Sequence, residues 1–370
     1  MNVLVVFTYG YSINTWDESG TFYKEIESYK LLSKNDVRFT FLAFAKNEPY
    51  IEYLKKYNIE VIPIYRKIKF SKYKTINYFK SFLIPFKFRS DLKNIDIVKQ
   101  NQLLGSWISI ILKYVLNKPL FIRTGYDMYE FSIKAKKKFL TKFLYKWLTF
   151  FSLYFADIYS VSSECDKKFL QKNFNKQSHN LVVRPNWVKE VMVTDLDRRY
   201  DNRLLCIGRL EEQKNHQLII SAFSNTNYQI DFIGEGGLKS ELKKQAKIYN
   251  TNINFLGKAN NEEIMDSLLK YKYYLTSSKY EGNPKSTLEA LSSGCIVIAS
   301  DIPNHREIIE HGFNGFLYSE NKRSLLNTFE DVTKNIDLKT ISSNARSIYR
   351  SNSLELIVKK ELNDLKSLKV

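Results

Sequence analysis

The sequence predicts an α/β fold with two doubly wound parallel sheets, and three observations lead to this prediction. The chain has 370 residues, which is too many for one ordinary core and suits two domains. Short runs of β-branched and aromatic residues alternate with longer amphipathic segments, the pattern of parallel strands covered by helices. The alternation breaks once, at 184–202, where the chain is polar and lacks a hydrophobic period.

The predicted elements follow this alternation through both halves. Strands are expected in the first half at 3–7, 39–44, 60–64, 95–99, 119–123 and 157–162, with helices such as 22–32 and 139–151 between them. In the second half they are expected at 203–208, 228–234, 253–257, 271–276, 295–300 and 315–319, followed by a helical tail over 325–370.

These elements predict a first domain over 1–186, a linker over 187–202 and a second domain over 203–352. The last segment, 353–370, is expected to form a helix that packs back on the first domain. Since a sheet needs covering, the apolar stripe of 139–151 is expected to pack on the first sheet and leave its lysines in solvent. The alternative is that the basic, aromatic stretch 134–151 faces an anionic membrane or single-stranded nucleic acid.

Composition indicates the compartment. Cys165, Cys206 and Cys295 are far apart and odd in number, which excludes a disulfide framework and favours a reducing environment. The N-terminus reads as a first strand, because it lacks the basic start of a signal peptide. The longest apolar runs stop well short of the ~18 residues that span a bilayer. The sequence therefore predicts a cytoplasmic protein.

The net charge of +18 is uneven. Residues 1–190 hold 32 Lys and Arg against 16 Asp and Glu, a net +16, whereas the remaining residues hold 25 and 23, a net +2. This asymmetry indicates that the two halves meet different partners.

Two cations follow the strand at 203–208. The chain turns at Gly208, and Arg209 and Lys214 precede a helix. Because ligands bind beyond the carboxyl ends of parallel strands, this pair suits a diphosphate. The alternative is a pair of solvated surface charges.

The stretch "TSSKYEGNPKSTLEALSSGC" (276–295) places two carboxylates around a helix start. Glu281 precedes the helix and Glu289 lies inside it, while Pro284 suits the first turn and Gly294 the end. The amides of a helix N-terminus attract anions, and carboxylates accept hydrogen bonds from sugar hydroxyls. The alternative is that Glu281 caps the helix and Glu289 lies on its surface.

These motifs resemble those of family 4 glycosyltransferases, retaining enzymes with the GT-B fold of two Rossmann-like domains that face each other across a cleft. The resemblance covers 203–319 through "IGRLEEQKN", "DFIGEGGLKSEL", "INFLGKANNEEIMDSL", "EGNPKSTLEALSSGCIVIASDIPNHREII" and "HGFNGFLY". In the first half it is limited to "SGTFYKEI" and "AD.Y.VSSE".

The resemblance implies a role for each matching residue. Arg209 and Lys214 would hold the donor diphosphate, Glu281 the donor sugar and Glu289 the nucleotide ribose. The donor site would also include Gly20, Gly208, Gly234, Gly236, Gly257, Lys258, Gly282, Asn283, Pro284, Lys285 and Ser286. It further implies transfer on the front face of the donor, with the leaving diphosphate helping to deprotonate the acceptor. Neither a cofactor nor a metal is expected, because protein cations replace the metal.

The first half departs from the family pattern. The family usually has a histidine in the first domain near the donor sugar, whereas here no histidine precedes His179. Thr124 stands where the histidine would be, and Arg123, Tyr126 and Asp127 are candidate substitutes, with Asp127 either catalytic or structural. The usual glycine pair of the first loop is reduced to Gly20 in "ESG".

The basic first half suggests a membrane contact. Residues 66–90 contain eight Lys and Arg, no Asp or Glu, and several aromatic residues. Such a face suits an anionic lipid surface, and single-stranded nucleic acid is the alternative. The hypothesis is peripheral attachment through 66–90 to the cytoplasmic face of the inner membrane.

The complete sequence-based hypothesis is a metal-independent hexosyl- or related transferase of bacterial surface polysaccharide synthesis, either lipopolysaccharide or capsule. It would move a sugar from a nucleotide diphosphate sugar, with UDP as the default nucleotide, to a glycan or an undecaprenyl-diphosphate-linked acceptor. Three alternatives remain: a metal-dependent GT-A enzyme using Asp195–Asp197, a basic nucleic-acid-binding protein, and another GT-B enzyme such as a sugar-nucleotide epimerase or a phosphorylase.

Overall fold

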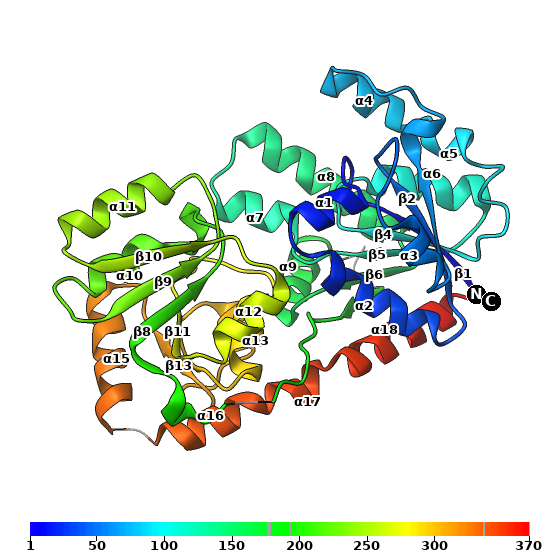
Figure 1. Ribbon diagram of the computed structural model, residues 1–370. Helices are drawn as coiled ribbons and strands as arrows, with labels where there is room; N and C mark the ends of the chain where they lie inside the picture. Colours follow the sequence, from blue (N-terminus) through cyan, green and yellow to red (C-terminus); the bar gives the residue numbers. More distant parts are fainter. Residues whose placement is uncertain (176–178, 193, 336, 370) are drawn as a thin grey trace. The chain divides into compact units, whose positions relative to one another are not determined.

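The computed structural model describes residues 1–175, 179–192, 194–335 and 337–369, and the chain forms two compact units (Figure 1). Unit 1 comprises Met1–Pro185 and Glu355–Val370, and unit 2 comprises Asn186–Leu354. The range 187–202, expected to be a linker, belongs to unit 2, although Val193 lies outside the described residues.

Unit 1 contains a parallel sheet of seven strands in the order β3-β2-β1-β4-β5-β6-β7. The strands are β1 (Asn2–Val6), β2 (Arg38–Ala43), β3 (Ile59–Pro63), β4 (Ile97–Asn101), β5 (Leu120–Arg123), β6 (Ile158–Val161) and β7 (Leu181–Val183). The sequence prediction missed β7, which is short and lies at the edge of the sheet.

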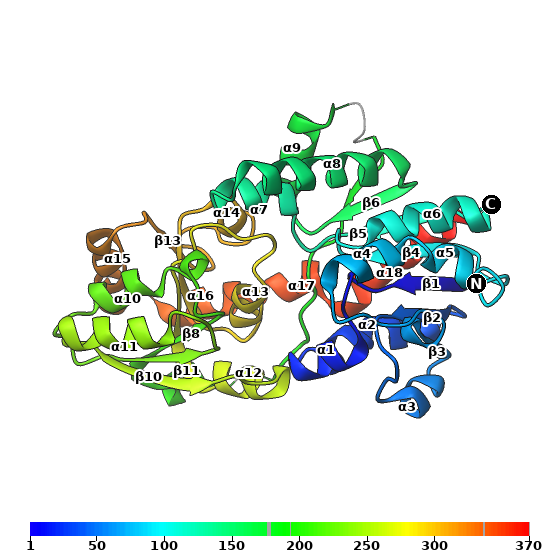
Figure 2. The same cartoon turned by 90° about the horizontal axis from the view of Figure 1, so that it is seen from above.

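The helices of unit 1 connect these strands and cover the sheet. They are α1 (Ile13–Glu18), α2 (Phe22–Ser33), α3 (Ile51–Lys55), α4 (Lys74–Ser81), α5 (Ile84–Lys87), α6 (Ser106–Leu116), α7 (Met128–Lys134), α8 (Phe139–Phe155), α9 (Glu164–Asn173) and α18 (Leu354–Leu368). Figure 2 shows α6 between α8 and the α4–α5 segment.

Neighbouring residues of β4 show which helices cover which face of this sheet. The ammonium of Lys99 lies over the ring of Tyr29 on α2 and pairs with Glu361 on α18. The next residue, Gln100, accepts a hydrogen bond from Ser109 on α6. Because side chains alternate along a strand, α2 and α18 cover one face and α6 covers the other.

Unit 2 contains a parallel sheet of six strands in the order β10-β9-β8-β11-β12-β13. The strands are β8 (Tyr200–Ile207), β9 (Gln229–Ile233), β10 (Asn252–Gly257), β11 (Tyr271–Thr276), β12 (Ile296–Ser300) and β13 (Phe316–Tyr318). The helices are α10 (His216–Ala222), α11 (Lys239–Ile248), α12 (Asn261–Leu268), α13 (Lys285–Ser292), α14 (Pro303–Arg306), α15 (Lys322–Asn335), α16 (Leu338–Arg346) and α17 (Ile348–Asn352).

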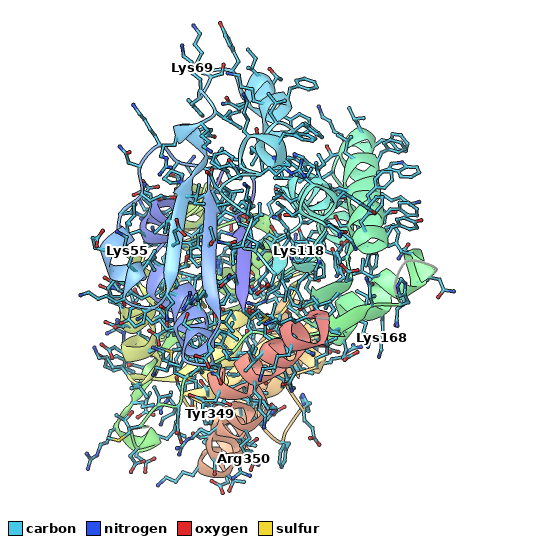
Figure 3. The ribbon with its side chains drawn as sticks, turned by 90° about the vertical axis from the view of Figure 1, so that its right-hand side faces the viewer. Lys55, Lys69, Lys118, Lys168, Tyr349 and Arg350 are labelled. Atoms are coloured by element: carbon cyan, nitrogen blue, oxygen red, sulfur yellow. The ribbon has the colours of Figure 1, made fainter. Side chains whose placement is uncertain are left out.

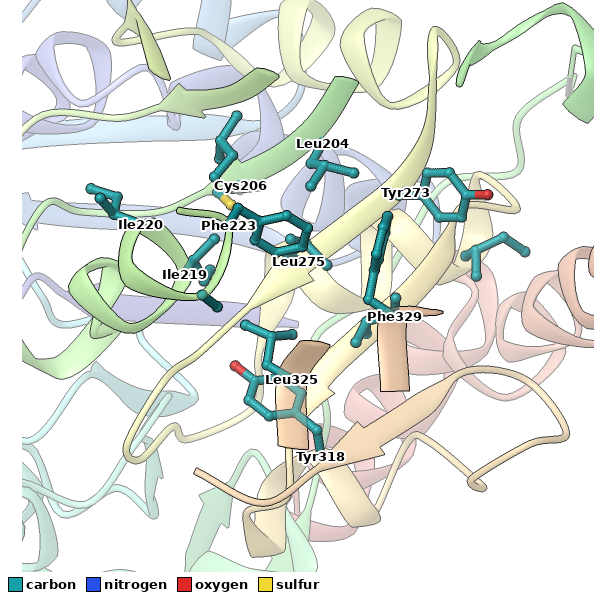
Figure 4. Close-up of a cluster of buried hydrophobic side chains, with 14 of the residues drawn as sticks. Leu204, Cys206, Ile219, Ile220, Phe223, Tyr273, Leu275, Tyr318, Leu325 and Phe329 are labelled. Carbon is teal, nitrogen blue, oxygen red and sulfur yellow. The ribbon is translucent and has the colours of Figure 1, made fainter. Parts of the chain in front are cut away.

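Two apolar cores lie on opposite faces of the second sheet. Leu204 and Cys206 of β8 pack with α10, α11 and α15 in one core, which Figure 4 shows in close-up. Leu205 and Ile207 pack with α13 in the other. Burial on both faces explains why the strands of this unit read as continuous apolar runs.

The structure corrects the prediction for 139–151. Helix α8 does form there, but Phe139, Leu140 and Phe143 are exposed rather than packed on the sheet. The buried residues of α8 are Thr149, Ser152 and Leu153, and the helix packs on α6 and α7. Because α6 already covers this side of the sheet, the apolar stripe of α8 has no sheet to face.

Candidate functional site

The topology of unit 2 brings the predicted donor residues together. The strand order reverses between β8 and β11, and ligands bind at such a switch point beyond the carboxyl ends of the strands. The loop after β8 carries Arg209 and Lys214, and the loop after β11 carries Glu281. The two motifs therefore meet at one edge of the sheet, although 67 residues separate Lys214 from Glu281.

Glycines allow the loops after β8 and β9 to interlock. A Cβ at Gly234 would lie 2.0 Å from the carbonyl oxygen of Gly208, and a Cβ at Gly236 would lie 2.4 Å from that of Leu210. The backbones are joined by hydrogen bonds from Leu210 N to Glu235 O and from Leu238 N to Leu210 O, each 3.0 Å long. These glycines are thus required by close backbone contact.

Lys214 and Glu281 form the central ion pair of the site. Lys214 Nζ lies 2.5 Å from Glu281 Oε1, and the side chains are only 16% and 10% exposed. Lys214 folds across Gly208, where a Cβ would come within 2.9 Å of Lys214 Cε. Burial alone would raise the pKa of Glu281, but Lys214 lowers the pKa below its ordinary value. Glu281 is therefore held as an anion.

Arg209 is placed differently from Lys214. Its side chain is 68% exposed and pairs with Glu211 at 3.2 Å. An exposed pair of this kind contributes little to stability, so it can rearrange towards a ligand at low cost.

Several residues that the sequence analysis did not single out shape the loop after β11. Gln213 Nε2 donates to Tyr280 O at 2.8 Å, and Ser277 Oγ donates to the carbonyl oxygens of Lys214 and Asn215. Asn304 Nδ2 donates to Gly282 O at 2.5 Å. The loop is therefore tied to both the β8 loop and α14.

His305 lies beside this network and is fully buried. Its Nδ1 donates to Ser300 O at 2.7 Å, and its pKa is lowered because burial disfavours the imidazolium. "DIPNHREII" contained both Asn304 and His305, but their partners Gly282 and Ser300 become visible only in the fold.

The N-terminus of α13 lies at the same edge, directly after Pro284. Lys285 begins the helix, and Ser286 Oγ accepts a hydrogen bond from Tyr274 OH on β11 at 2.9 Å. One turn on, Glu289 is buried, and its Oε1 accepts from Asn261 Nδ2 at 3.0 Å. Asn261 starts α12 after β10, so it directs Glu289 towards the carboxyl edge of the sheet.

The remaining predicted donor residues also lie at the carboxyl edge of this sheet. Gly257 O accepts from Gly234 N at 2.7 Å, and Lys258 follows it as an exposed side chain. Asn283 is joined to Asn186 by two hydrogen bonds, one to its side chain and one to its carbonyl oxygen. The structure thus gives Asn283 a role in anchoring the start of unit 2.

The candidates in unit 1 occupy a different environment. Gly20 follows Ser19, the C-cap of α1, and has a backbone φ of 73°. Asp127 is completely buried and caps α7, where its Oδ1 accepts from Glu130 N and its Oδ2 from Thr149 Oγ1. Burial raises its pKa to about 6. Both carboxylate oxygens of Asp127 accept hydrogen bonds within unit 1. This favours a structural role for Asp127 over a catalytic one.

The other residues considered near this position lie at the carboxyl end of β5. Arg123 lies 3.9 Å from Glu361, Thr124 is buried and donates to Ser160 O, and Tyr126 contacts the ring of Phe131.

Asp195 and Asp197 have partners within unit 2. Asp195 Oδ1 accepts from the backbone of Asp197, and Asp197 pairs with Lys339 at 2.6 Å. The GT-A alternative requires an apolar strand directly before these residues. In the described part of the chain, the preceding strand is β7, which ends at Val183.

A comparison with known families decides the class of this protein. Residues 196–347 match the family described as "Glycosyl transferases group 1". This part of the chain is similar to group 1 glycosyltransferases. The match contains the predicted donor residues of unit 2, and the protein is a transferase enzyme.

Curated relatives of this glycosyltransferase belong to several organisms. The chain is 28% identical over 254 residues to the capsular polysaccharide biosynthesis glycosyltransferase CapH of Staphylococcus aureus, covering 64% of this chain and 69% of CapH. It is 26% identical to the O-antigen biosynthesis glycosyltransferase WbnH of Escherichia coli, covering 71% of this chain and 73% of WbnH.

Solved structures show that the glycosyltransferase has the GT-B fold. Sucrose-phosphate synthase from Thermosynechococcus elongatus matches with a TM-score of 0.81 at 13% identity, covering 100% of this chain and 99% of that one. Anabaena HepE, solved in complex with UDP, matches with a TM-score of 0.75 at 17% identity, covering 99% and 100%. In the described part of the glycosyltransferase, no helix combines the length and apolar character needed to cross a bilayer.

Proposed function

We propose that this glycosyltransferase moves a sugar, with retention of configuration, from a UDP-sugar to a glycan or lipid-linked glycan in bacterial surface polysaccharide synthesis. The observation that carries the proposal is the convergence of Arg209, Lys214 and the N-terminus of α13 at the switch point, beside the buried Glu281. CapH and WbnH support the pathway, and the UDP complex of HepE supports the nucleotide.

The donor would lie along this edge of unit 2. Lys214, Arg209 and the amides at the start of α13 would stabilise the diphosphate as the glycosidic bond breaks. Glu281, held as an anion by Lys214, would accept hydrogen bonds from the sugar hydroxyls. A carboxylate has about four acceptor positions, so Asn261 can orient Glu289 while Glu289 binds the ribose hydroxyls.

The two cations would supply the charge that a metal ion supplies in other transferases, so the reaction is proposed to proceed without a metal. The acceptor is proposed to be carried on undecaprenyl diphosphate. A relative in Campylobacter jejuni, 25% identical over 215 residues, is named for transfer to such a lipid-linked glycan. Attachment through 66–90 would bring the enzyme to the cytoplasmic membrane face where such acceptors lie.

A thermal-shift screen with UDP, GDP, ADP and CMP and their sugar conjugates, with EDTA present, tests the proposal. A ligand at 100 times its Kd stabilises the fold by about 2.7 kcal/mol. We expect UDP compounds to raise the Tm of the parent and to do so much less in Arg209→Ala with Lys214→Ala. Absence of any nucleotide shift, or an equal shift in the double variant, would contradict the assigned site.

Turnover is measured in the same preparation. Release of UDP that depends on an added glycan acceptor and survives EDTA supports metal-independent transfer. Release that continues without any acceptor would instead favour an epimerase or hydrolase reaction. The anomeric configuration of the product, read by NMR, tests retention.

A further inference from the structure

Helix α8 presents an apolar face to solvent. Its exposed side chains are Phe139, Leu140, Phe143, Leu144, Trp147, Phe151 and Tyr154. Phe139 is 81% exposed and Leu140 66%. On a helix of 3.6 residues per turn these positions share one side, which an ordinary surface helix would turn towards the core. Contiguous exposed apolar surface of this kind marks an interaction site.

The rings on this face form a continuous row. Phe143 lies 6.3 Å from Phe139 and 6.1 Å from Trp147, and Trp147 lies 5.7 Å from Phe151, measured between ring centroids. The row continues onto α6 through Tyr114, which is exposed and contacts Phe155.

Polar contacts on the opposite side hold α8 in this orientation. Thr149 Oγ1 donates to the buried carboxylate of Asp127 at 3.1 Å, and Ser152 Oγ donates to Ser106 Oγ at 2.8 Å. Turning the apolar row inward would break both hydrogen bonds and leave Asp127 and Ser106 with unsatisfied polar atoms. The exposed row is therefore a fixed feature of unit 1.

The surroundings of the row are basic. No Asp or Glu occurs between Phe131 and Ala156, whereas six lysines do: Lys134, Lys136, Lys137, Lys138, Lys142 and Lys146. Beyond α6, the 66–90 segment adds eight Lys and Arg and the exposed rings of Phe70, Phe79 and Phe86. Figure 3 shows this segment, marked by Lys69, standing out from the body of unit 1.

We propose that α8 is a membrane-binding helix of this enzyme, whose aromatic row enters the interface of an anionic bilayer while its lysines contact the lipid headgroups. Aromatic and leucine side chains on one face with lysines along its borders are the composition of helices that lie in a membrane interface. This extends the membrane attachment proposed for 66–90 and does not depend on which sugar is transferred.

Charge favours a lipid surface over a second copy of the chain and over single-stranded nucleic acid as the partner of α8. Pairing of two copies through α8 would bring Lys138, Lys142 and Lys146 of each copy to one interface, and like charges oppose such contact. Single-stranded nucleic acid needs rings interleaved with cations along a groove. Here Leu140 and Leu144 interrupt the rings, and the lysines lie outside the row.

Co-sedimentation at low salt with vesicles of phosphatidylglycerol and phosphatidylethanolamine tests the proposal. We expect the parent chain to bind them at least tenfold more tightly than vesicles of phosphatidylcholine. The triple variant Phe143→Ser, Leu144→Ser, Trp147→Ser should lose at least tenfold of this binding. Ile248→Ser, which removes an even more exposed apolar side chain from α11 in unit 2, is the control and should bind as the parent does.

Quenching by brominated lipids tests whether α8 itself enters the bilayer. Trp147→Phe keeps the apolar row, so this variant should bind the vesicles but lose the quenching seen in the parent. The proposal is overturned if the parent does not bind anionic vesicles, if the triple variant binds undiminished, or if Trp147→Phe is quenched as strongly as the parent.

Two further measurements serve as controls for the vesicle-binding results. The triple variant should keep the Tm of the parent and its nucleotide-dependent shift, which separates loss of membrane binding from loss of fold or donor site. Light scattering after gel filtration reports the oligomeric state. A parent dimer that the triple variant dissociates would overturn the proposal in favour of self-association through α8.

Discussion

Individual residues of the proposed donor site have partners that are distant in sequence. Glu281 is an anion because Lys214 compensates its burial, and Glu289 is directed by Asn261 on another helix. The spacing of Glu281 and Glu289 allowed both to face one crevice, and the family resemblance assigned both to the donor. The spacing could not indicate that each carboxylate has a partner of its own, because Lys214 lies in the loop after β8 and Asn261 begins α12.

Replacing Glu289 tests its proposed contact with the ribose. Hydrogen bonds to a charged group contribute about 1.5–3 kcal/mol each, so Glu289→Ala should weaken UDP binding by roughly 10- to 100-fold. Isothermal titration measures this change. Glu241→Ala, an exposed glutamate on α11, should leave the affinity unchanged. Parent-like affinity in Glu289→Ala would remove Glu289 from the site.

The buried carboxyl group of Asp166 should make the stability of unit 1 depend on pH. Burial raises its pKa to about 7, whereas in the unfolded chain it ionises near 3.8. The folded state therefore holds a proton that the unfolded state has lost, so the contribution of Asp166 to stability falls as the pH rises from about 4 to 7. Asn cannot ionise, so the variant Asp166→Asn should not lose stability in this way as the pH rises.

We therefore expect the Tm of Asp166→Asn relative to the parent to increase between pH 5 and 8, measured by differential scanning calorimetry. The difference between the two chains is the useful quantity, because the lowered pKa values of His216 and His305 act in the opposite direction in both. A difference that stays constant over this range would contradict the assignment.

Among the elements, α18 is joined to the first sheet by a buried ion pair. Lys99 and Glu361 are 2.5 Å apart, with side chains 1% and 4% exposed. Burial alone would lower the pKa of Lys99, but Glu361 raises it, so both groups are charged. Arg184, which follows β7, forms a second ion pair with Asp364 on α18. The helix is thus part of unit 1, although it is last in the chain.

Breaking this pair should destabilise unit 1. Glu361→Ala leaves a buried cation without its partner, which costs about 3–5 kcal/mol. Replacing both partners, as in Lys99→Met with Glu361→Leu, should restore most of the lost stability. Chemical denaturation measures both, with Glu52→Ala, from the exposed Lys55–Glu52 pair, as a control that changes stability by less than about 1 kcal/mol. Equal losses in the single and double variants would contradict this account.

For the whole molecule, the path of the chain has a consequence for truncation. The chain leaves unit 1 at Pro185, forms unit 2 and returns to unit 1 from Glu355 onward. Deleting residues 355–370 should therefore lower hydrogen-exchange protection in β4 and α2 of unit 1, because Lys99 loses Glu361. Amides of β8 and β11 in unit 2 should exchange as in the parent. Loss of protection confined to unit 2 would contradict the division.

Much of this architecture could be predicted from the sequence, because its signals are local. Each of the twelve predicted strand segments overlaps a strand, and the turns at Gly208 and Gly294 follow from short-range geometry. The cationic and carboxylate motifs of the proposed donor site were likewise visible in short stretches. Hydrophobic periodicity and the spacing within a motif depend only on residues that are close in sequence, so they can be recognised without the fold.

The tertiary structure decided which motifs meet and which surfaces stay open. The sequence placed the stripe of α8 on the sheet, since an apolar helix face usually covers one. Only the fold shows that α6 already occupies that position and that Thr149 and Ser152 hold the stripe outward. Similarly, the Lys214–Glu281 pair requires the reversal of strand order between β8 and β11. Both outcomes depend on packing between elements that are distant in sequence. A local sequence pattern does not show which of several elements will occupy a given surface.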